Sequence, residues 1–295
     1  MILYHKMIGE KPISIVIEMG LGSALAEWIP FAKQLSGRAG VLLYERAGIH
    51  KSEISMQERS PENIAKELFQ LLFEIDHEDK IILIAHSQGG LYAQQFCRLY
   101  PEMVKGLILI DPLSPVDNEF KARLNPKEYQ LSGVDKSQNF IYMKMLAKLR
   151  LGFLTKKLLK NAPPFYYYDS FSKAEMNEIL ECADSVTHAK TALSEYQKAH
   201  EEKYLLPLSD KESFPDIPLI LITHSSVLAV EESMKFGNNT REFAAKIEEM
   251  WQDIMKIYLT FSNKSVWIQA KKSTHYIHLT EPHLIISALE EYFLF

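Results

Sequence analysis

The stretch IILIAHSQGGLYAQQFCRLYP, residues 81–101, joins two structural patterns through a very short turn. Its first part, up to Ala85, is a continuous apolar run, which is typical of a strand buried on both faces. A helical pattern begins at Gln88, and Ser87 stands in the turn between Ala85 and Gly89. A serine in such a turn projects above the sheet at a helix N-terminus, where backbone N–H groups stabilise negative charge. The stretch predicts a nucleophilic Ser87; the alternative is a serine that merely caps the helix.

Apolar runs of the same kind lie on both sides of this stretch. They predict strands at Ile13–Ile17, Val41–Tyr44, Lys80–Ala85, Val104–Ile110, Pro218–Thr223 and Ser265–Ala270, with an edge strand at Ile2–Met7. Helical patterns lie between them at Ala24–Leu35, Pro61–Ile75, Gln88–Tyr100, Thr240–Phe261 and Pro282–Tyr292. This alternation predicts an α/β protein with a mostly parallel, doubly wound sheet.

One long interval interrupts the alternation. About a hundred residues, Ser114–Pro215, separate two consecutive strands, although a direct crossover is far shorter. The interval is helical and aromatic in character, and it includes Phe165, Tyr166 and Tyr167. We interpret it as a helical cap over the sheet, with these three residues as candidate substrate-binding groups. The predicted parts are a first core segment (1–113), the cap (114–215) and a second core segment (216–295).

Composition and charge exclude several classes of protein. Its 295 residues suffice for one large α/β domain with an insertion. A net charge of −5 gives no electrostatic reason to expect a nucleic-acid partner. Two cysteines without CxxC spacing argue against a disulfide scaffold or a thiolate metal site. Without a long apolar run or an N-terminal leader pattern, we expect a cytoplasmic protein with no integral membrane segment.

The loop MGLGS, residues 19–23, suggests a second hypothesis. Gly20 and Gly22, followed by Glu45 after the next strand, also fit a nicotinamide-dependent oxidoreductase, in which glycines admit a pyrophosphate and an acid binds the ribose. That fingerprint needs a third small residue, but Leu25 stands at its place. The oxidoreductase is therefore the less favoured alternative.

Taken together, the motifs resemble the serine-nucleophile branch of the α/β-hydrolase family. The resemblance spans nearly the whole chain outside the cap and rests on AHSQGG (85–90), MGLGS (19–23), YERAGIHKS (44–52), LILIDP (107–112) and THYIHLTEP (274–282). Ala85, Met19, Glu45 and His50 depart from the family's usual residues. The resemblance implies an oxyanion hole made by the backbone N–H groups of Leu21 and Gln88.

The resemblance also implies a base and an acid for Ser87. The family keeps its histidine in the loop after the last strand, which here holds His275, while His278 is expected to face the final helix or solvent. Asp111 follows the strand Val104–Ile110, and the order Ser87, Asp111, His275 agrees with this fold. The alternatives for the acid are Glu231 and Glu232, after the next strand.

These residues predict hydrolysis of an ester or related acyl bond in a small to medium apolar substrate, through an acyl-enzyme. The chemistry needs no cofactor and no metal, and the sequence shows no histidine–carboxylate cluster that suggests one. A protein of another class, a catalytically silent receptor that binds a ligand under its cap, remains the alternative because a full triad can be retained for binding.

Overall fold

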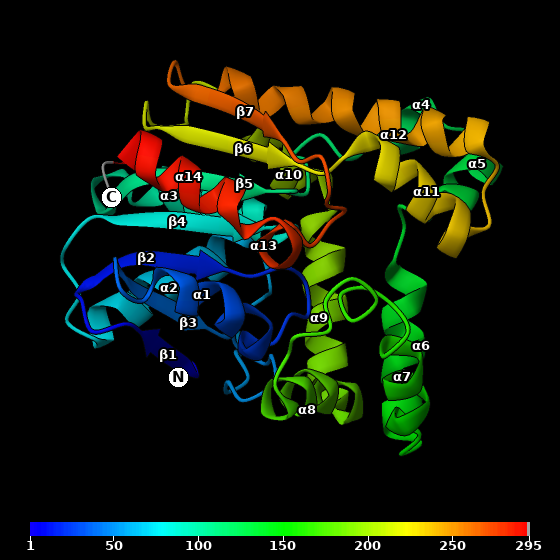
Figure 1. Ribbon diagram of the computed structural model, residues 1–295, viewed down its shortest axis with the longest axis horizontal. Coiled ribbons are helices and arrows are strands. Elements are labelled where there is room, and N and C mark those ends of the chain that lie inside the picture. Colours follow the sequence, from blue (N-terminus) through cyan, green and yellow to red (C-terminus); the bar gives the residue numbers. More distant parts are fainter. Residues whose placement is uncertain (294–295) are drawn as a thin grey trace.

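Seven strands form one sheet in the order β1-β3-β2-β4-β5-β6-β7 in the computed structural model, which describes residues 1–293 (Figure 1). The strands are β1 (His5–Ile8), β2 (Ile13–Glu18), β3 (Gly40–Tyr44), β4 (Ile81–His86), β5 (Val104–Ile110), β6 (Leu219–Thr223) and β7 (Ser265–Gln269). Neighbouring strands are parallel except for β1, which pairs with β3 in the antiparallel direction. The predicted α/β fold with a mostly parallel sheet is confirmed, and the edge strand begins at His5 rather than at Ile2.

Helices connect most of these strands. Their bounds are η1 (Leu25–Trp28), α1 (Ile29–Leu35), α2 (Pro61–Glu74), α3 (Gly89–Leu99), η2 (Pro101–Met103), α4 (Glu119–Arg123), α5 (Pro126–Ser132), α6 (Ser137–Lys148), α7 (Gly152–Leu159), α8 (Lys173–Glu181), η3 (Cys182–Asp184), α9 (Val186–Ala199), α10 (Glu202–Ser209), α11 (Ser226–Gly237), α12 (Arg241–Met255), η4 (Lys256–Thr260), α13 (Ile277–Thr280) and α14 (Pro282–Phe293). The predicted helices do not include α11, in which Val230 is the one buried residue. Within residues 1–293, no helix combines the length and the apolar character needed to cross a bilayer.

The two faces of the sheet support separate apolar cores, because side chains along a strand alternate between the faces. On β2, Ile15 and Ile17 pack with residues of α1 and α14, whereas Val16 packs with residues of α2 and α3. Figure 1 accordingly shows α1 and α14 in front of the sheet and α2 and α3 behind it. The central strands are therefore covered by packed helices on both faces.

The helices α4 to α10 occupy the long interval between β5 and β6. In Figure 1, α6 to α9 stand beside the sheet at the end where the parallel strands finish. Helix α10 instead packs against α3, one of the helices that cover the sheet. Its residues Leu205 and Leu208 belong to the same apolar cluster as Leu91 and Tyr92 of α3. The interval therefore begins and ends on the core while its middle lies beside the carboxyl ends of the strands.

Candidate functional site

Ser87 occupies the turn between β4 and α3 in a left-handed backbone conformation, with φ +53°. A non-glycine residue in this region costs roughly 1–3 kcal/mol and persists where its surroundings hold it. Its N–H donates to the carbonyl of Ile110 at 3.1 Å, and its carbonyl accepts from the N–H groups of Gly90 (3.0 Å) and Leu113 (2.9 Å). These backbone bonds fix the turn independently of the serine hydroxyl.

Two glycines allow other backbone segments to approach this turn closely. A Cβ atom at Gly89 would lie 2.5 Å from the carbonyl oxygen of Met19, and one at Gly20 would lie 3.3 Å from the Cβ of Ser87. The first distance is prohibitive for any side chain. The loop of residues 19–23 therefore lies directly against the Ser87 turn.

The backbone N–H groups of Leu21 and Gln88, the expected oxyanion donors, belong to the residues that directly follow Gly20 and Ser87. Within residues 1–293, neither donates to a protein acceptor. The Gln88 side chain is directed to the hydroxyl of Tyr92, at 2.5 Å. Two free N–H groups beside a serine are the arrangement that can bind an oxyanion.

His275 and Asp111 are brought together across 164 residues of sequence, with Nδ1 of His275 2.6 Å from Oδ2 of Asp111. The carbonyl of His275 accepts from Nε2 of His86, the residue before Ser87, at 3.0 Å. The structure has no hydrogen bond between the Ser87 hydroxyl and His275 within the described residues. Such catalytic bonds are often long in the free enzyme and tighten when substrate binds.

Asp111 is almost completely buried, at 3% exposure. Burial raises the pKa of this carboxyl, but the charges and hydrogen bonds of His224 and His275 outweigh burial and hold the pKa well below its usual range. In the described part of the chain, neither Glu231 nor Glu232 bonds to His275. Asp111 is therefore the ionised partner of the His275 ring.

Sequence reasoning did not identify His224, which follows β6 and contacts the other oxygen of Asp111. Its backbone N–H donates to Oδ1 at 3.0 Å, and its Nδ1 lies 2.7 Å from the same atom. On the far side, Nε2 of His224 lies 2.9 Å from Oε2 of Glu248 in α12. No local motif marks this pair, because the strand and the helix that carry it meet only in the folded chain.

The expectation that His278 faces the final helix or solvent is wrong. Its side chain is fully buried and stacks on Trp28, with ring centroids 3.8 Å apart. Burial lowers the pKa of both His278 and His86 well below the usual value, and the neighbouring His275 lowers each further. Both rings are neutral packing groups around His275.

Glu45, the acid of the oxidoreductase alternative, is fully buried and engaged by the protein. One oxygen accepts from the N–H of Leu25 and from His50 Nδ1, each at 3.0 Å, and the other accepts from the N–H of Lys51 at 3.0 Å. Glu45 is thus closed to a ribose, and the structure gives that alternative no support. His50, which replaces a glycine of the family motif, retains a left-handed φ of +42° and bonds to this glutamate.

The same group is the one cluster of metal-ligating side chains within residues 1–293. Glu45, His50 and Glu178 offer ligand atoms within 4.8 Å of one another. Glu45 is already satisfied as described, and the ammonium of Lys51 lies 3.0 Å from Glu178. A cation at this position would compete with the lysine charge, so we assign no metal to the cluster.

Arg46 links the loop of residues 19–23 to the inserted helices. Its guanidinium donates to the carbonyls of Met19 (2.6 Å) and Gly20 (3.0 Å), immediately before Leu21. It also pairs with Glu195 of α9 at 2.8 Å, and Glu195 in turn pairs with Arg59 at 3.1 Å. The buried Glu195 thereby holds both arginines, one of which orients the loop.

We expect Glu195→Ala to lower the free energy of unfolding by about 3 kcal/mol, because two buried guanidinium groups then share one carboxylate fewer. Arg46 keeps only Glu18 and Arg59 keeps only Glu67 as a counter-charge. Burial raises the pKa of Glu195, but the arginines outweigh burial and lower it, so the carboxylate is charged in the folded state. Urea denaturation measures the change. The control is Glu202→Ala, which removes an exposed glutamate of α10. Equal stability of the two variants would contradict this role.

The three aromatic residues expected to bind substrate occupy different surroundings. Phe165 packs edge-on against Phe171 inside the insertion, with centroids 5.6 Å apart. Tyr166 is 46% exposed and contacts Phe236 of α11. Tyr167 lies beside Thr274, the residue before His275; burial raises its pKa, and a nearby glutamate raises it further. Of the three, Tyr167 is the one placed next to the loop that carries His275.

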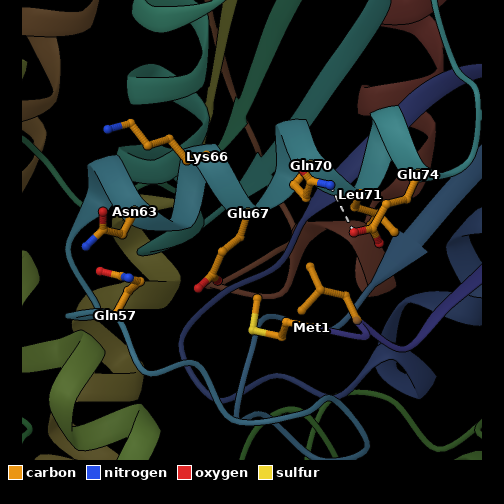
Figure 2. Close-up of a pocket in the computed structure, with 9 residues that line it drawn as sticks. Met1, Gln57, Asn63, Lys66, Glu67, Gln70, Leu71 and Glu74 are labelled. Carbon is orange, nitrogen blue, oxygen red and sulfur yellow. Dashed lines mark hydrogen bonds between the residues drawn. The ribbon is translucent and has the colours of Figure 1, made fainter.

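A surface hollow of about 410 Å³ lies away from these residues (Figure 2). It is lined by residues of α2, among them Lys66 and Glu67, and by Met1 and Leu3 near the N-terminus. Figure 2 shows polar side chains around its rim, and a hydrogen bond joins Gln70 to Glu74 at 3.0 Å. None of the residues lining this hollow comes from the serine turn or the His275 loop, so we assign it no part in the chemistry.

Comparison with known proteins agrees with this fold. A family model described as "alpha/beta hydrolase fold" matches residues 13–205. An uncharacterized protein of Bacillus subtilis, YqjL, is 24% identical over 95% of this chain and 83% of its own. A (lyso)-N-acylphosphatidylethanolamine lipase of Mus musculus is 33% identical over 35% of this chain and 32% of its own. The epoxide hydrolase CorEH, solved without ligand, shares the fold with a TM-score of 0.68 at 15% identity, over 99% of this chain and 94% of its own. This chain therefore belongs to the α/β-hydrolase family.

Proposed function

We propose that the protein is a serine hydrolase that cleaves an ester or related acyl bond of a small to medium apolar substrate. The observations that support this proposal are a strained Ser87 followed by the free N–H of Gln88, and a loop against its turn that carries the free N–H of Leu21. A histidine bonded to a buried, ionised aspartate completes the set. A serine that merely caps a helix needs none of these neighbours. One relative, matched over 32% of its own length, is named a lipase, which is in keeping with an acyl-bond substrate.

In the first half of the reaction, the Ser87 hydroxyl attacks the substrate carbonyl, and Nε2 of His275 takes its proton. Asp111 holds Nδ1–H of the ring and stabilises the imidazolium that forms. The N–H groups of Leu21 and Gln88 bind the negative oxygen of the tetrahedral intermediate. Collapse of this intermediate releases the alcohol, which receives the proton from His275.

In the second half, water replaces the alcohol at the acyl-enzyme. His275 takes a proton from the water as it attacks, and a second tetrahedral intermediate forms in the same pair of N–H groups. Its collapse releases the acid and returns the proton to Ser87. Every group in this cycle belongs to the described residues, and the proposal includes no cofactor or metal.

A fluorophosphonate probe tests the proposal, because it forms a stable bond to an activated serine and mimics the tetrahedral intermediate. We expect rapid stoichiometric labelling at Ser87, located by peptide mass analysis, together with hydrolysis of p-nitrophenyl esters. Labelling without turnover would favour the silent receptor. The absence of both would overturn the serine mechanism.

We further propose that residues 114–215 form a cap that roofs the site and selects the acyl chain. Helix α9 supports this, since a Cβ at Gly22 in the oxyanion loop would lie 3.4 Å from Nε2 of His188. A roof of this kind excludes water and strengthens the oxyanion contacts.

We expect Tyr167→Ala to change the relative kcat/KM for short and long p-nitrophenyl esters by about tenfold, because it enlarges the space next to the His275 loop. Phe165→Ala is expected to lower the melting temperature without changing the preference, since Phe165 packs inside the insertion. Tyr166→Ala provides an exposed aromatic control. An unchanged preference in Tyr167→Ala would remove this residue from the substrate site.

A further inference from the structure

The buried carboxylate of Asp111 lies between two histidines, one on each oxygen. Oδ2 accepts from Nδ1 of His275 at 2.6 Å, and Oδ1 faces Nδ1 of His224 at 2.7 Å. The second histidine is itself placed between two carboxylates, because its Nε2 lies 2.9 Å from Glu248. A chain of four ionisable side chains thus runs from the catalytic loop to α12.

The geometry fixes the protonation of His224. Both of its ring nitrogens face carboxylate oxygens, which accept hydrogen bonds and do not donate them when ionised, so both nitrogens carry a proton and the ring is a cation. Burial lowers the pKa of His224, but the charges and hydrogen bonds of Asp111 and Glu248 outweigh it and raise the pKa to about 10. Trp251 covers one face of the ring, with centroids 4.1 Å apart.

Glu248 is held in place as well. Its second oxygen, Oε1, accepts from Nε2 of Gln252, one helical turn later, at 2.7 Å. The carboxylate is buried, at 8% exposure, whereas the adjacent Glu249 is exposed. The ion pair between His224 and Glu248 is therefore shielded from salt and water.

We propose that His224, held by Glu248, is a cationic positioning residue for the catalytic site. It keeps the buried Asp111 ionised, fixes its Oδ1 atom, and sets the pH at which His275 can act as a base. This inference rests on the proposed function, since it takes His275 to be that base. His224 itself touches neither substrate nor nucleophile in this proposal.

The direction of the effect follows from the charges. The positive charge of His224 beside Oδ1 partly cancels the negative charge of Asp111. Asp111 therefore stabilises the imidazolium form of His275 less strongly than it would alone. In a variant without the His224 cation, the full negative charge of Asp111 acts on His275. We then expect His275 to lose its proton at a higher pH than in the wild type.

Other titratable groups near these rings have to be separated from this effect. Two carboxylates, Asp111 and Glu248, face the ring of His224. The titratable groups around His275 are Asp111, His86 and Tyr276, with His278 and Glu27 farther away. His86 and His278 are neutral, and burial keeps Tyr276 protonated by raising its pKa. Glu27 differs, because burial raises its pKa to about 7 against the lowering effects of Ser23 and His275. A Glu27→Gln variant therefore belongs in the experiment.

The test is the pH dependence of kcat/KM for an ester in the wild type and in His224→Gln, whose amide still donates to Asp111 without a charge. We expect the acidic midpoint to move up by about one pH unit. Glu248→Gln is expected to move it in the same direction by less and serves as the main variant if His224→Gln fails to fold. Glu249→Gln is the matched control and should leave the midpoint unchanged. In the Glu27→Gln background the His224→Gln shift should persist.

A second measurement does not depend on turnover. In the spectrum of the protein with ¹⁵N-labelled histidine, we expect one imidazole to keep both N–H protons above about pH 8, to disappear in His224→Gln, and to deprotonate at lower pH in Glu248→Gln. Absence of that cation would overturn the inference whatever the activity. Ser87-dependent turnover with an unchanged midpoint in both variants would overturn it and leave the proposed function intact. If Ser87 proves dispensable, the proposed function fails and the positioning role fails with it.

Discussion

Ser87→Ala is expected to lower the turnover of an ester by about 10⁴-fold or more while the fold stays intact. The hydroxyl oxygen is the atom that forms the bond to the acyl group, and alanine offers no replacement. The turn itself should survive, because the bonds that hold it are made by the backbone of Ser87 with Ile110, Gly90 and Leu113. Initial rates with a p-nitrophenyl ester and circular dichroism measure the two parts of this prediction.

Ser226→Ala is the matched control for Ser87→Ala. Ser226 also follows the carboxyl end of a strand, but its hydroxyl accepts from the side chain of Gln269 at 3.0 Å. We expect this variant to keep wild-type turnover and fluorophosphonate labelling, whereas Ser87→Ala loses both. An active, unlabelled Ser87→Ala protein would end the proposed mechanism.

The central strands could be predicted because burial on both faces leaves a direct trace in the sequence. Every residue of β3, β4 and β6 is buried, and each strand reads as an almost unbroken apolar run. Helix α11 left no such trace, since most of its residues are partly exposed. His278 looked like a loop residue but fills the space beside Trp28, a packing relation that no local pattern encodes.

The candidate site could be predicted where local spacing along the chain indicates a chemistry. A serine between small residues at the end of a buried strand predicts a sharp turn between strand and helix. The family resemblance indicated His275 and Asp111. His224 and Glu248 give no comparable signal, because they are 24 residues apart on a strand end and a helix. Arg46 and Glu195 are 149 residues apart, and only the docking of α9 on the core reveals their pairing. Long-range charge pairs depend on the fold, so the sequence alone could not show them.

Asp111→Asn is expected to lower ester turnover by about 10⁴-fold. Three N–H groups face the two oxygens of Asp111, two from His224 and one from His275, but an asparagine offers a single acceptor oxygen. His224 presents both its backbone N–H and its ring to Oδ1, so the amide oxygen remains on that side. The NH₂ group then faces His275.

A donor facing Nδ1 of His275 forces that nitrogen to become the acceptor, and the ring proton moves to Nε2. Nε2 is the atom that has to receive the Ser87 proton, so the base is blocked although the ring has not moved.

Glu231→Gln and Glu232→Gln do not change this tautomer and should retain wild-type kcat. The substitution also removes one counter-charge of the buried His224, so turnover is to be measured well below the melting temperature of the variant. If Asp111→Asn keeps kcat within about tenfold of the wild type, the tautomer is set by another group and Asp111 is not the triad acid. If either glutamine variant instead loses turnover on the scale predicted for Asp111→Asn, that glutamate has taken the role.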